Sequence, residues 1–466
     1  MCLMRQHRGT NETTLLTRPI QNRLQTSASI ALRSDSFLDW KILLLLPFAP
    51  RPRLTGLWRQ PPLTRAILKS YFNYAIMTFM FPRHILPVLQ DRARHQPVVT
   101  ITGPRQSGKT TLCRLAFPDL PYVNLEQPDA REFARSDPHA FLDRLRDGAI
   151  IDEIQRVPDL LSWIQVDVDA HPAPGRFILT GSHQFELSRQ VAQSLAGRTA
   201  LLRLLPLSIA ELRAAGPLTT DELLHRGGYP RIHADHLDPA VALGDYFETY
   251  VQRDLRELVQ LRHLAEFERF VRLAAGRVGQ LLNLQSLAAD AGVSGHTARE
   301  WITLLEASFI VFRLPPWFAN IGKRLVKSPK LYFYDVGLAA WLVGIRHCEH
   351  LAAHPLRGHL FENLAVLEVL KTYANAGERP DLHFFRDSAG NEADLVLEHG
   401  SSLMLLEIKS ARSVAPDAMH SVAAIRRGLG ARATWSALVY DGAEAQRRSD
   451  FDVVPCVELR RWLTGG

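Results

Sequence analysis

The sequence predicts an α/β protein with three folded parts: a parallel sheet built around a phosphate-binding loop, a winged-helix connector and a second α/β domain. Three observations predict this organisation. A glycine-rich loop joins an apolar strand to a helix within residues 97–112, two helical stretches precede an apolar strand within residues 283–314, and an apolar hairpin at residues 391–410 carries acidic residues beside a lysine. At 466 residues the chain is too long for one hydrophobic core, so two or three domains are expected.

The N-terminal extension holds the basic charge of the chain. The whole chain has a formal net charge of +7, and residues 1–76 alone carry a net +8, so the remaining 390 residues are close to neutral. Net charge therefore gives no argument for nucleic-acid binding by the folded part. The extension lacks a sustained hydrophobic period, which predicts either disorder or a start codon placed too early, with Met77 or Met80 as the true first residue.

The sequence indicates neither a membrane anchor nor an oxidising compartment. The apolar run of the extension, Ile42 to Leu46, is far shorter than the ~20 residues that span a membrane. The four cysteines lie far apart and form no Cys-x-x-Cys pair, which disfavours a zinc site or a disulfide framework. We therefore expect a cytoplasmic protein without a membrane partner.

The glycine-rich loop matches the pattern G-x-x-x-x-G-K-[ST] between a β-branched strand and a helix. Its glycines let backbone N–H groups approach phosphate, and the helix N-terminus adds a partial positive charge. We expect Lys109 to bridge the β and γ phosphates as a catalytic residue and Thr110 to hold Mg²⁺; the alternative is a chance turn. The predicted nucleotide-binding loop comprises Gly103, Pro104, Arg105, Gln106, Ser107, Gly108, Lys109, Thr110 and Thr111.

A second apolar strand, in the segment GAIIDEIQ (148–155), ends in two acidic residues. Asp152 at the carboxyl end of a buried parallel strand can hold the Mg²⁺ shell opposite the loop. Glu153 beside it can polarise the attacking water, which favours ATP hydrolysis over phosphate binding alone. The alternative is a pair of solvated acids after a strand. No Asn-Lys-x-Asp motif occurs, which disfavours a GTPase.

Three further polar residues are candidates for sensing the nucleotide. The strand RFILTGS ends in Thr180 and Ser182, and a hydroxyl there either orients the water and senses the γ-phosphate or simply ends the strand. Arg198 lies between a helix and an apolar strand, from which it would reach the nucleotide of a neighbouring subunit. Arg231, in the segment GGYPRI, lies on an expected lid. For both arginines the alternative is an ordinary surface position.

The order of GPRQSGKTTL, YVNLE, AIIDEIQ, FILTGS, LAGRT, PLSIAEL and GGYPR resembles a prokaryotic AAA+ ATPase family whose members carry a C-terminal domain of unknown function related to PD-(D/E)XK nucleases. The resemblance covers residues 80–466. Its most specific parts are the glycine-rich loop and the strand that ends in Asp152 and Glu153. It implies a P-loop NTPase sheet with a helical lid. It also implies that Thr180 or Ser182 acts as sensor 1, Arg198 as an arginine finger and Arg231 as sensor 2. An arginine finger acting in trans implies an ATP-dependent homo-oligomer.

In the middle of the chain, the sequence predicts amphipathic helices and then a helix-turn-helix of the winged type. Residues 245–275 have an amphipathic helical pattern, and residues 283–316 give two helices around a Gly-Val-Ser turn and then an apolar strand. Residues 262–330 carry a local net charge of +5. We expect His296, Thr297 and Arg299 to open a recognition helix that contacts DNA. The alternative is a packing or protein-contact module with a solvated basic face.

The hairpin at residues 391–410 turns at Gly400 and Ser401. A two-residue turn there pairs Leu395 with Leu406, pairs Leu397 with Met404, and places Asp394 opposite Glu407. Two carboxylates about 5 Å apart destabilise a strand pair unless a cation offsets them. The register that buries the leucines is therefore the register that brings the acids together.

A helix acid completes this group. Glu362 lies near the start of GHLFENLAVLEVLK, an expected amphipathic helix, so the order is Glu362, Asp394, Glu407 and Lys409. Hard carboxylate oxygens suit Mg²⁺ or Mn²⁺ as metal ligands, and Glu407 and Lys409 would be catalytic, with Lys409 stabilising developing charge. The spacing resembles the PD-(D/E)XK signature, with Ala393 where a proline often precedes the aspartate. The alternatives are an exposed hairpin, or a nuclease-like fold that is inactive or held in check.

These observations predict four segments: an extension at residues 1–76, an ATPase domain with its lid at 77–235, a helical linker and winged helix at 236–325, and a nuclease-like domain at 326–466. The leading hypothesis is an ATPase that couples nucleotide state to DNA binding or metal-dependent DNA cleavage. The competing hypothesis is an ATP-switched regulatory or scaffold protein that does not cleave. RNA as the target is a third reading.

Overall fold

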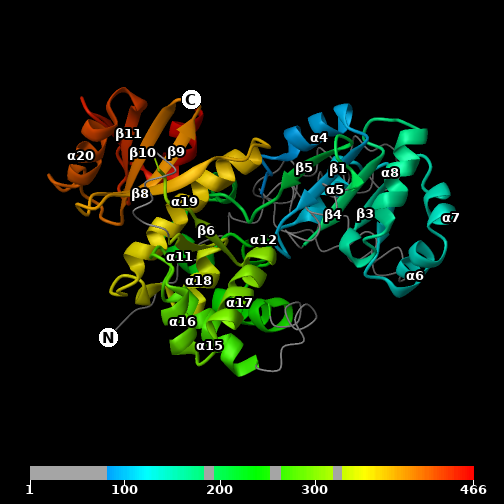
Figure 1. The fold of residues 1–466 in the computed structure, drawn as a ribbon, viewed down its shortest axis with the longest axis horizontal. Coiled ribbons are helices and arrows are strands. Elements are labelled where there is room, and N and C mark those ends of the chain that lie inside the picture. Colours follow the sequence, from blue (N-terminus) through cyan, green and yellow to red (C-terminus); the bar gives the residue numbers. More distant parts are fainter. Residues whose placement is uncertain (1–80, 183–193, 252–263, 319–327, 466) are drawn as a thin grey trace, which may run out of the picture. The chain divides into compact units, whose positions relative to one another are not determined.

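A computed structural model of the protein describes residues 81–182, 194–251, 264–318 and 328–465 (Figure 1). All of these residues belong to one compact unit, which spans Phe72–Gly466. Within the described residues, no helix combines the length and the apolar character that crossing a membrane requires.

The first sheet has five parallel strands in the order β2-β3-β4-β1-β5, which confirms the predicted parallel α/β sheet. β4 lies between β1 and β3, so the three strands that carry the loop, Asp152 and Thr180 are neighbours. Their residues are mostly apolar and all buried, as expected for a parallel sheet covered on both faces. The strands are β1 (Val98–Thr102), β2 (Tyr122–Asn124), β3 (Ala149–Asp152), β4 (Phe177–Gly181) and β5 (Thr199–Arg203).

Helices cover both faces of this sheet (Figure 1). On one face Val99 and Ile101 of β1 pack with Leu89 of α4 and Leu112 of α5, and on the other face Ile151 of β3 packs with Ile164 of α8. The helices of this part are α4 (Leu86–His95), α5 (Lys109–Ala116), α6 (Pro128–Ser136), α7 (Pro138–Asp143), the 3₁₀ turn η2 (Ile154–Arg156) and α8 (Leu160–Ala170).

A mainly helical part follows the sheet. Its elements are α10 (Ile209–Arg213), α11 (Thr220–Arg226), α12 (Pro230–Ala234), α13 (Pro239–Tyr246), the π-helix η3 (Phe247–Val251), α15 (Leu264–Ala275), α16 (Leu284–Ala291), α17 (Gly295–Ala307), β6 (Val311–Leu314), β7 (Lys330–Phe333), α18 (Val336–Leu342) and the 3₁₀ turn η4 (Cys348–His350). Part of the helix expected at 245–275 falls on residues 252–263, which lie outside the described residues.

The expected helix pair around the Gly-Val-Ser turn is present. α16 ends at Gly292, whose φ of +76° is left-handed, and the Ser294 side chain caps α17 by accepting a hydrogen bond from the Thr297 N–H. The antiparallel pair of β6 and β7 follows. This order of elements agrees with the expected winged helix, whose identification and DNA contact stay predictions.

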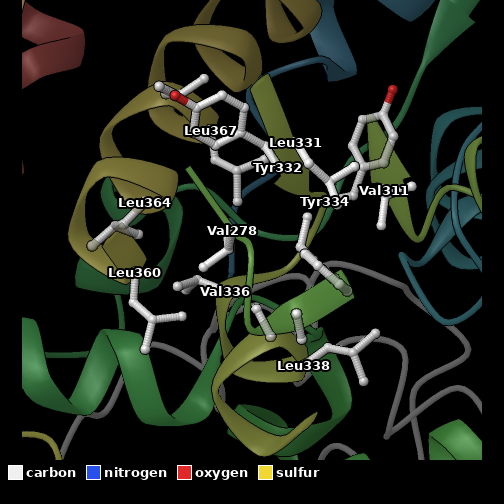
Figure 2. Close-up of a cluster of buried hydrophobic side chains, with 14 of the residues drawn as sticks. Val278, Val311, Leu331, Tyr332, Tyr334, Val336, Leu338, Leu360, Leu364 and Leu367 are labelled. Atoms are coloured by element: carbon white, nitrogen blue, oxygen red, sulfur yellow. The ribbon is translucent and has the colours of Figure 1, made fainter. Parts of the chain in front are cut away.

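One hydrophobic core joins this helical part to the C-terminal domain. Figure 2 shows Leu360, Leu364 and Leu367 of α19 (Arg357–Asn375) beside Tyr332 of β7 and Val336 of α18. This core therefore contains residues from both sides of the expected domain boundary at residue 326, which itself lies outside the described residues.

The C-terminal sheet is mixed and has the strand order β12-β13-β11-β10-β9-β8. The two antiparallel strands of the hairpin confirm the predicted register, because Leu406 pairs with Leu395 and Met404 with Leu397. Gly400, in the turn between these strands, has a φ of +60°. α19 contributes to the core on one face and α20 to the core on the other. The elements are β8 (Leu382–Arg386), β9 (Glu392–His399), β10 (Ser402–Lys409), α20 (His420–Leu429), η5 (Gly430–Arg432), β11 (Ala433–Tyr440), β12 (Gln446–Arg447), β13 (Asp452–Pro455), η6 (Cys456–Glu458) and α21 (Leu459–Thr464).

The amphipathic pattern expected for the helix at 358–371 was wrong. All residues from Leu360 to Thr372 of α19 are buried. The polar positions that suggested a solvent face instead have buried partners: Asn363 hydrogen-bonds both backbone polar groups of Phe333, and Lys371 forms an ion pair with Glu368. A pattern of polar residues cannot distinguish a solvated face from such internal partners.

Candidate functional site

The phosphate loop has the geometry that its glycines predict. Gly103 has a φ of +151°, and a Cβ there would lie 2.0 Å from the Leu204 carbonyl oxygen, so no side chain fits. Gly108 also has a positive φ, of +92°. The Lys109 Nζ is buried and donates to the carbonyl oxygens of Gly103 at 2.9 Å and Pro104 at 2.8 Å. The lysine therefore lies within the loop that it is expected to serve.

Asp152, at the end of β3, is the centre of a hydroxyl cluster. Its Oδ2 accepts from Thr110 Oγ1 at 2.8 Å and from Tyr122 OH at 2.6 Å, and its Oδ1 accepts from Thr180 Oγ1. Because β4 lies beside β3, Thr180 reaches this carboxylate from the neighbouring strand. Thr110 and Asp152 thus form a pair of hard oxygen donors at the start of α5, a donor set that fits Mg²⁺.

Glu153 lies next to this cluster in a left-handed conformation, with a φ of +57°. Ser182 Oγ donates to its Oε2 at 3.2 Å, and Gln155 Nε2 donates both to Glu153 Oε2 and to Ser182 Oγ. The Thr180 and Ser182 hydroxyls therefore donate to different carboxylates, Thr180 to Asp152 and Ser182 to Glu153, while the Glu153 N–H donates to Thr180 Oγ1 at 3.4 Å. A non-glycine residue in this backbone region costs about 1–3 kcal/mol and often occurs at functional sites.

The electrostatics of the loop follow from burial. Burial lowers the pKa of Lys109 below its ordinary value, although the carboxylates of Glu153 and Asp152 oppose this shift. A lysine with a desolvated ammonium interacts strongly with an anionic partner, because little water competes for it.

Arg83 holds the loop from outside the motif, and no signal in the sequence pointed to it. Its Nη1 donates to the Ser107 carbonyl oxygen and its Nη2 to the Leu205 carbonyl oxygen, each at 2.7 Å, while its Nε donates to Glu211 at 3.2 Å. The partners lie up to 128 residues away in the chain. Such contacts cannot be read from local spacing.

A cavity opens beside the loop where α5 begins. Phe81, Arg83, Leu86, Gly108, Thr111, Leu112, Leu115, Leu207 and Pro230 line it. Thr111 and Gly108 of the predicted nucleotide-binding loop therefore border a mainly apolar cavity. Of the remaining loop residues, Arg105 lies 3.3 Å from Glu126, and Gln106 has a φ of +60°.

Arg198 and Arg231 lie on the surface, apart from the Asp152 cluster. Arg198 forms a two-bond ion pair with Asp169, at 2.5 and 2.8 Å, and Arg231 pairs with Asp235 at 3.3 Å. Both arginine side chains are partly or largely exposed. Their expected roles in sensing nucleotide are not visible within one chain.

The acidic residues of the C-terminal domain surround a lysine that the sequence analysis did not include. Lys330 of β7 places its Nζ 2.9 Å from Glu362, 2.6 Å from Glu392 and 3.3 Å from Asp394. Tyr332 OH donates to Glu362 Oε1 at 2.5 Å. We call Lys330, Glu362, Glu392, Asp394, Glu407 and Lys409 the acid cluster. Lys330 belongs to a strand 32 or more residues away from its partners, so spacing alone could not indicate it.

The hairpin strands supply Asp394, Glu407 and Lys409 to the acid cluster. Asp394 Oδ2 accepts from the Ile408 N–H at 2.9 Å, and Lys409 Nζ lies 2.5 Å from Glu407 Oε1. Glu407 Oε2 is buried and has no hydrogen-bond partner among the described residues. Among the described residues, a different group brings three possible metal-ligand atoms within 4.8 Å of one another: Asp381, His383 and Glu398. Glu362, Asp394 and Glu407 are thus neighbours in one cluster but do not converge this closely.

Burial and like charge shift the protonation of the acid cluster. Burial and the Glu362 carboxylate raise the pKa of Asp394 to about 6, and burial and Asp394 raise the pKa of Glu407 to about 8. Burial opposes the charge of Lys330, but Asp394, Glu362 and Glu392 outweigh it, so the pKa of Lys330 lies above its ordinary value. The lysines are therefore cations at neutral pH.

Three families match consecutive parts of the chain: one described as an AAA domain at residues 95–213, and two described as domains of unknown function, DUF8612 at 218–349 and DUF4143 at 357–459. Uncharacterised proteins of Mycobacterium tuberculosis and Mycobacterium bovis are each 34% identical over 379 residues, which cover 80% of this chain and 83% of theirs. A Walker-type ATPase of Pyrococcus abyssi superposes with a TM-score of 0.39 at 13% identity, covering 56% of this chain and 95% of its own.

Proposed function

Because this chain belongs to the family of its mycobacterial relatives and carries an AAA-type ATPase domain, we propose that it hydrolyses ATP at the phosphate loop and that nucleotide state controls a C-terminal site acting on DNA. One observation carries the proposal. Helix α19 forms hydrogen bonds with the backbone of Leu207 and Ile209, and Leu207 lines the cavity beside the loop. The same helix supplies Glu362 to the acid cluster.

The ATPase chemistry rests on four residues. Lys109 binds the β and γ phosphates, and Thr110 and Asp152 hold Mg²⁺, which neutralises phosphate charge. Glu153 polarises the attacking water, with Ser182 and Gln155 fixing the direction of its carboxylate. Thr180 senses the γ-phosphate through Asp152.

The apolar lining of the cavity beside Gly108 and Thr111 offers a surface against which the base of the nucleotide would lie. Its lining combines apolar side chains, such as Phe81 and Leu112, with the backbone of the loop. Small-molecule sites are mostly apolar with a few polar groups, and an adenine ring has two apolar faces. Pro230, next to Arg231 at the start of α12, closes one side, which is the position expected of a lid.

Helix α19 supports coupling between this cavity and the acid cluster. Glu368 Oε2 accepts from the Ile209 N–H and Lys371 Nζ donates to the Leu207 carbonyl oxygen, each at 2.9 Å. Leu207 itself lines the cavity. Glu362 lies six residues earlier on the same helix, about 9 Å along its axis. A shift of residues 207–209 on nucleotide binding would therefore move a ligand residue of the acid cluster.

The DNA part of the proposal rests on the acid cluster and on α17. Glu362, Asp394 and Glu407 would hold Mg²⁺ or Mn²⁺, which supplies a Lewis acid for phosphodiester cleavage, and Lys409 would stabilise the charge that develops. The first turn of α17 exposes His296 and Arg299 to solvent, as a DNA-contacting helix requires.

A second candidate function is an ATP-switched regulatory or scaffold protein without cleavage. The specific observation that favours it is Lys330, whose ammonium already forms ion pairs with Glu362 and Asp394, two of the three carboxylates that would hold the metal ion. In that case nucleotide state would change a binding surface instead of a reaction.

The test combines ATP turnover with DNA cleavage in the full-length protein. Wild type, Lys109→Ala and Asp394→Ala are each assayed for ATP hydrolysis with and without DNA, and for cleavage of plasmid and single-stranded DNA in Mg²⁺ or Mn²⁺. The proposal expects DNA-stimulated turnover, and cleavage that Asp394→Ala abolishes while turnover persists. ATP turnover without any effect of DNA and without cleavage would favour the regulatory function. Absence of ATP turnover in the wild type would contradict both.

A further inference from the structure

We propose that Lys330 is the resident cation of the acid cluster and that a divalent metal ion binds there only by taking its place. The inference deepens the proposed function, because it concerns the metal site of the same cluster. It does not require that the site cleaves DNA.

Lys330 lies where a metal ion would collect its ligands. Its Nζ contacts carboxylate oxygens of Glu362, Glu392 and Asp394 at 2.6 to 3.3 Å, and its side chain is only 5% exposed. These acids come from α19 and β9, so the ammonium is the point at which the two elements meet. Divalent ions draw carboxylate oxygens to about 2.0–2.6 Å, so exchange requires a small contraction of the cluster.

The backbone of Lys330 is fixed on both sides. Lys330 pairs with Leu314 of β6 and forms a bridge with Leu281, while the Leu331 N–H donates to the Gln280 carbonyl oxygen at 3.0 Å. Displacement of the ammonium therefore needs only a change of side-chain torsions. A flexible four-carbon stem allows this without unfolding of β7.

The acid cluster also has an acceptor that the protein does not satisfy. Glu407 Oε2 has no hydrogen-bond partner among the described residues, and the Glu407 side chain is 9% exposed. Its other oxygen, Oε1, contacts Lys409. A buried carboxylate oxygen without a partner is unfavourable, so the cluster has unused capacity for a cation. This observation is independent of Lys330 and indicates a place for a cation beside Asp394, whose carboxylate acts on Glu407.

Competition between the two cations follows from charge. With Lys330 in place, a divalent ion must displace an ammonium that holds three carboxylates in a site with little water. Removal of the ammonium takes away the cation that these three carboxylates share, although Arg386 still lies 3.6 Å from Glu392. The loss of this shared cation raises the affinity for Mn²⁺. The wild-type cluster is therefore a weak metal site, and the Lys330→Met variant is a strong one.

The test measures Mn²⁺ binding to the full-length protein without nucleotide, by calorimetry and by the electron paramagnetic resonance of free Mn²⁺. Lys330→Met should bind one more Mn²⁺ per chain than wild type, or bind it at least tenfold more tightly. Adding Asp394→Asn to Lys330→Met should abolish that gain. Arg412→Ala is the matched control, since it removes an equal charge from an exposed position outside the acid cluster and should leave binding at the wild-type level.

A stability measurement covers the case in which Lys330→Met folds poorly. Its midpoint of thermal unfolding should be lower than that of wild type in EDTA and should recover with Mn²⁺, whereas wild type should hardly respond. A variant that is equally unstable with EDTA and with Mn²⁺, or a wild type that binds Mn²⁺ as tightly as Lys330→Met, overturns the inference. Mn²⁺ binding by the variant without DNA cleavage leaves the inference standing and contradicts only the cleavage part of the proposed function.

Discussion

Lys109 and Asp152, at the phosphate loop, each have their own partners, so the effect of replacing either residue can be stated. Lys109 is enclosed by carbonyl oxygens of its own loop, and Asp152 collects three hydroxyls. Under the proposed function, replacement of such a residue removes one defined interaction with nucleotide or metal.

Lys109→Ala should lower the rate of ATP hydrolysis by roughly 100-fold or more, because the variant loses the cation that stabilises the β and γ phosphates in the transition state. Steady-state phosphate release measures this. Lys409→Ala removes a lysine of the acid cluster and should keep the wild-type rate. Turnover by Lys109→Ala near the wild-type rate would mean that hydrolysis occurs elsewhere.

The acid cluster should make the stability of the protein depend on pH. Because burial raises the pKa of Glu407 to about 8 and that of Asp394 to about 6, the folded state holds protons that the unfolded chain has released. The contribution of Asp394 and Glu407 to stability is therefore full below about pH 4 and falls as the pH rises towards 8, by about 1.4 kcal/mol for each pH unit that separates the folded pKa of a group from its unfolded pKa. Urea unfolding in EDTA at pH 5.5, 7 and 8.5 measures this fall.

Glu407→Gln should flatten the pH dependence, since it removes the group whose pKa is raised the most. A wild-type stability that rises between pH 5.5 and 8.5 would contradict the protonated state assigned to Glu407. A Glu378→Gln variant, which changes a carboxylate outside the acid cluster, should keep the wild-type slope.

At this scale, the sequence indicated residues whose partners are close in the chain or aligned by a motif. Lys109, Thr110 and Asp152 follow from the loop and from the end of an apolar strand. Arg83 and Lys330 could not be predicted, because their partners come together only through tertiary contacts, up to 128 residues away for Arg83.

At the scale of elements, α19 hydrogen-bonds to residues 207 and 209 and also carries Glu362 of the acid cluster. It is a buried helix whose polar residues are satisfied by other elements. The turn residues Gly400 and Ser401 allowed the hairpin register to be predicted from the sequence. The environment of α19 could not be predicted, because buried and solvated polar residues have the same spacing along a helix.

Lys371→Met should destabilise the protein by about 3–5 kcal/mol, because it leaves Glu368 charged and without its buried partner. The double variant Glu368→Leu, Lys371→Met should cost less than Lys371→Met alone, since it leaves no unpaired charge. Chemical unfolding of the single and double variants measures both values.

The folded double variant should also lose any effect of DNA on ATP turnover while keeping basal turnover. DNA stimulation that survives loss of both contacts to residues 207 and 209 would contradict a coupling role for α19.

On the scale of the whole molecule, the helical part and the C-terminal domain share one hydrophobic core. The sequence suggested separate domains, whereas the core of the helical part continues into the C-terminal domain through α19 (Figure 2). Composition and motifs mark the parts, but the amount of buried surface between them depends on side chains that meet only in the fold.

Self-association provides a further prediction. If Arg198 acts on the nucleotide of a neighbouring subunit, the exposed ion pair with Asp169 must open, and Mg²⁺ with ATP should shift the protein to an oligomer. Sedimentation velocity of a Glu153→Gln variant with ATP and with ADP measures this. Arg198→Ala should lower turnover, while Arg146→Ala, a change to another exposed arginine, should have no effect. A monomer with full turnover would contradict the role of Arg198.

The central claim, that nucleotide at the phosphate loop changes the acid cluster through α19, is tested most directly by hydrogen–deuterium exchange of the full-length protein. Exchange is compared between Mg²⁺ with ATP and Mg²⁺ with ADP, in Glu153→Gln to slow hydrolysis, with Lys109→Ala as the control. The account predicts that ATP changes exchange in the loop, in residues 205–211, in α19 and in β9 and β10, and that Lys109→Ala removes all of these changes. A response that ends within residues 95–213, with α19 and the hairpin unchanged, would contradict it.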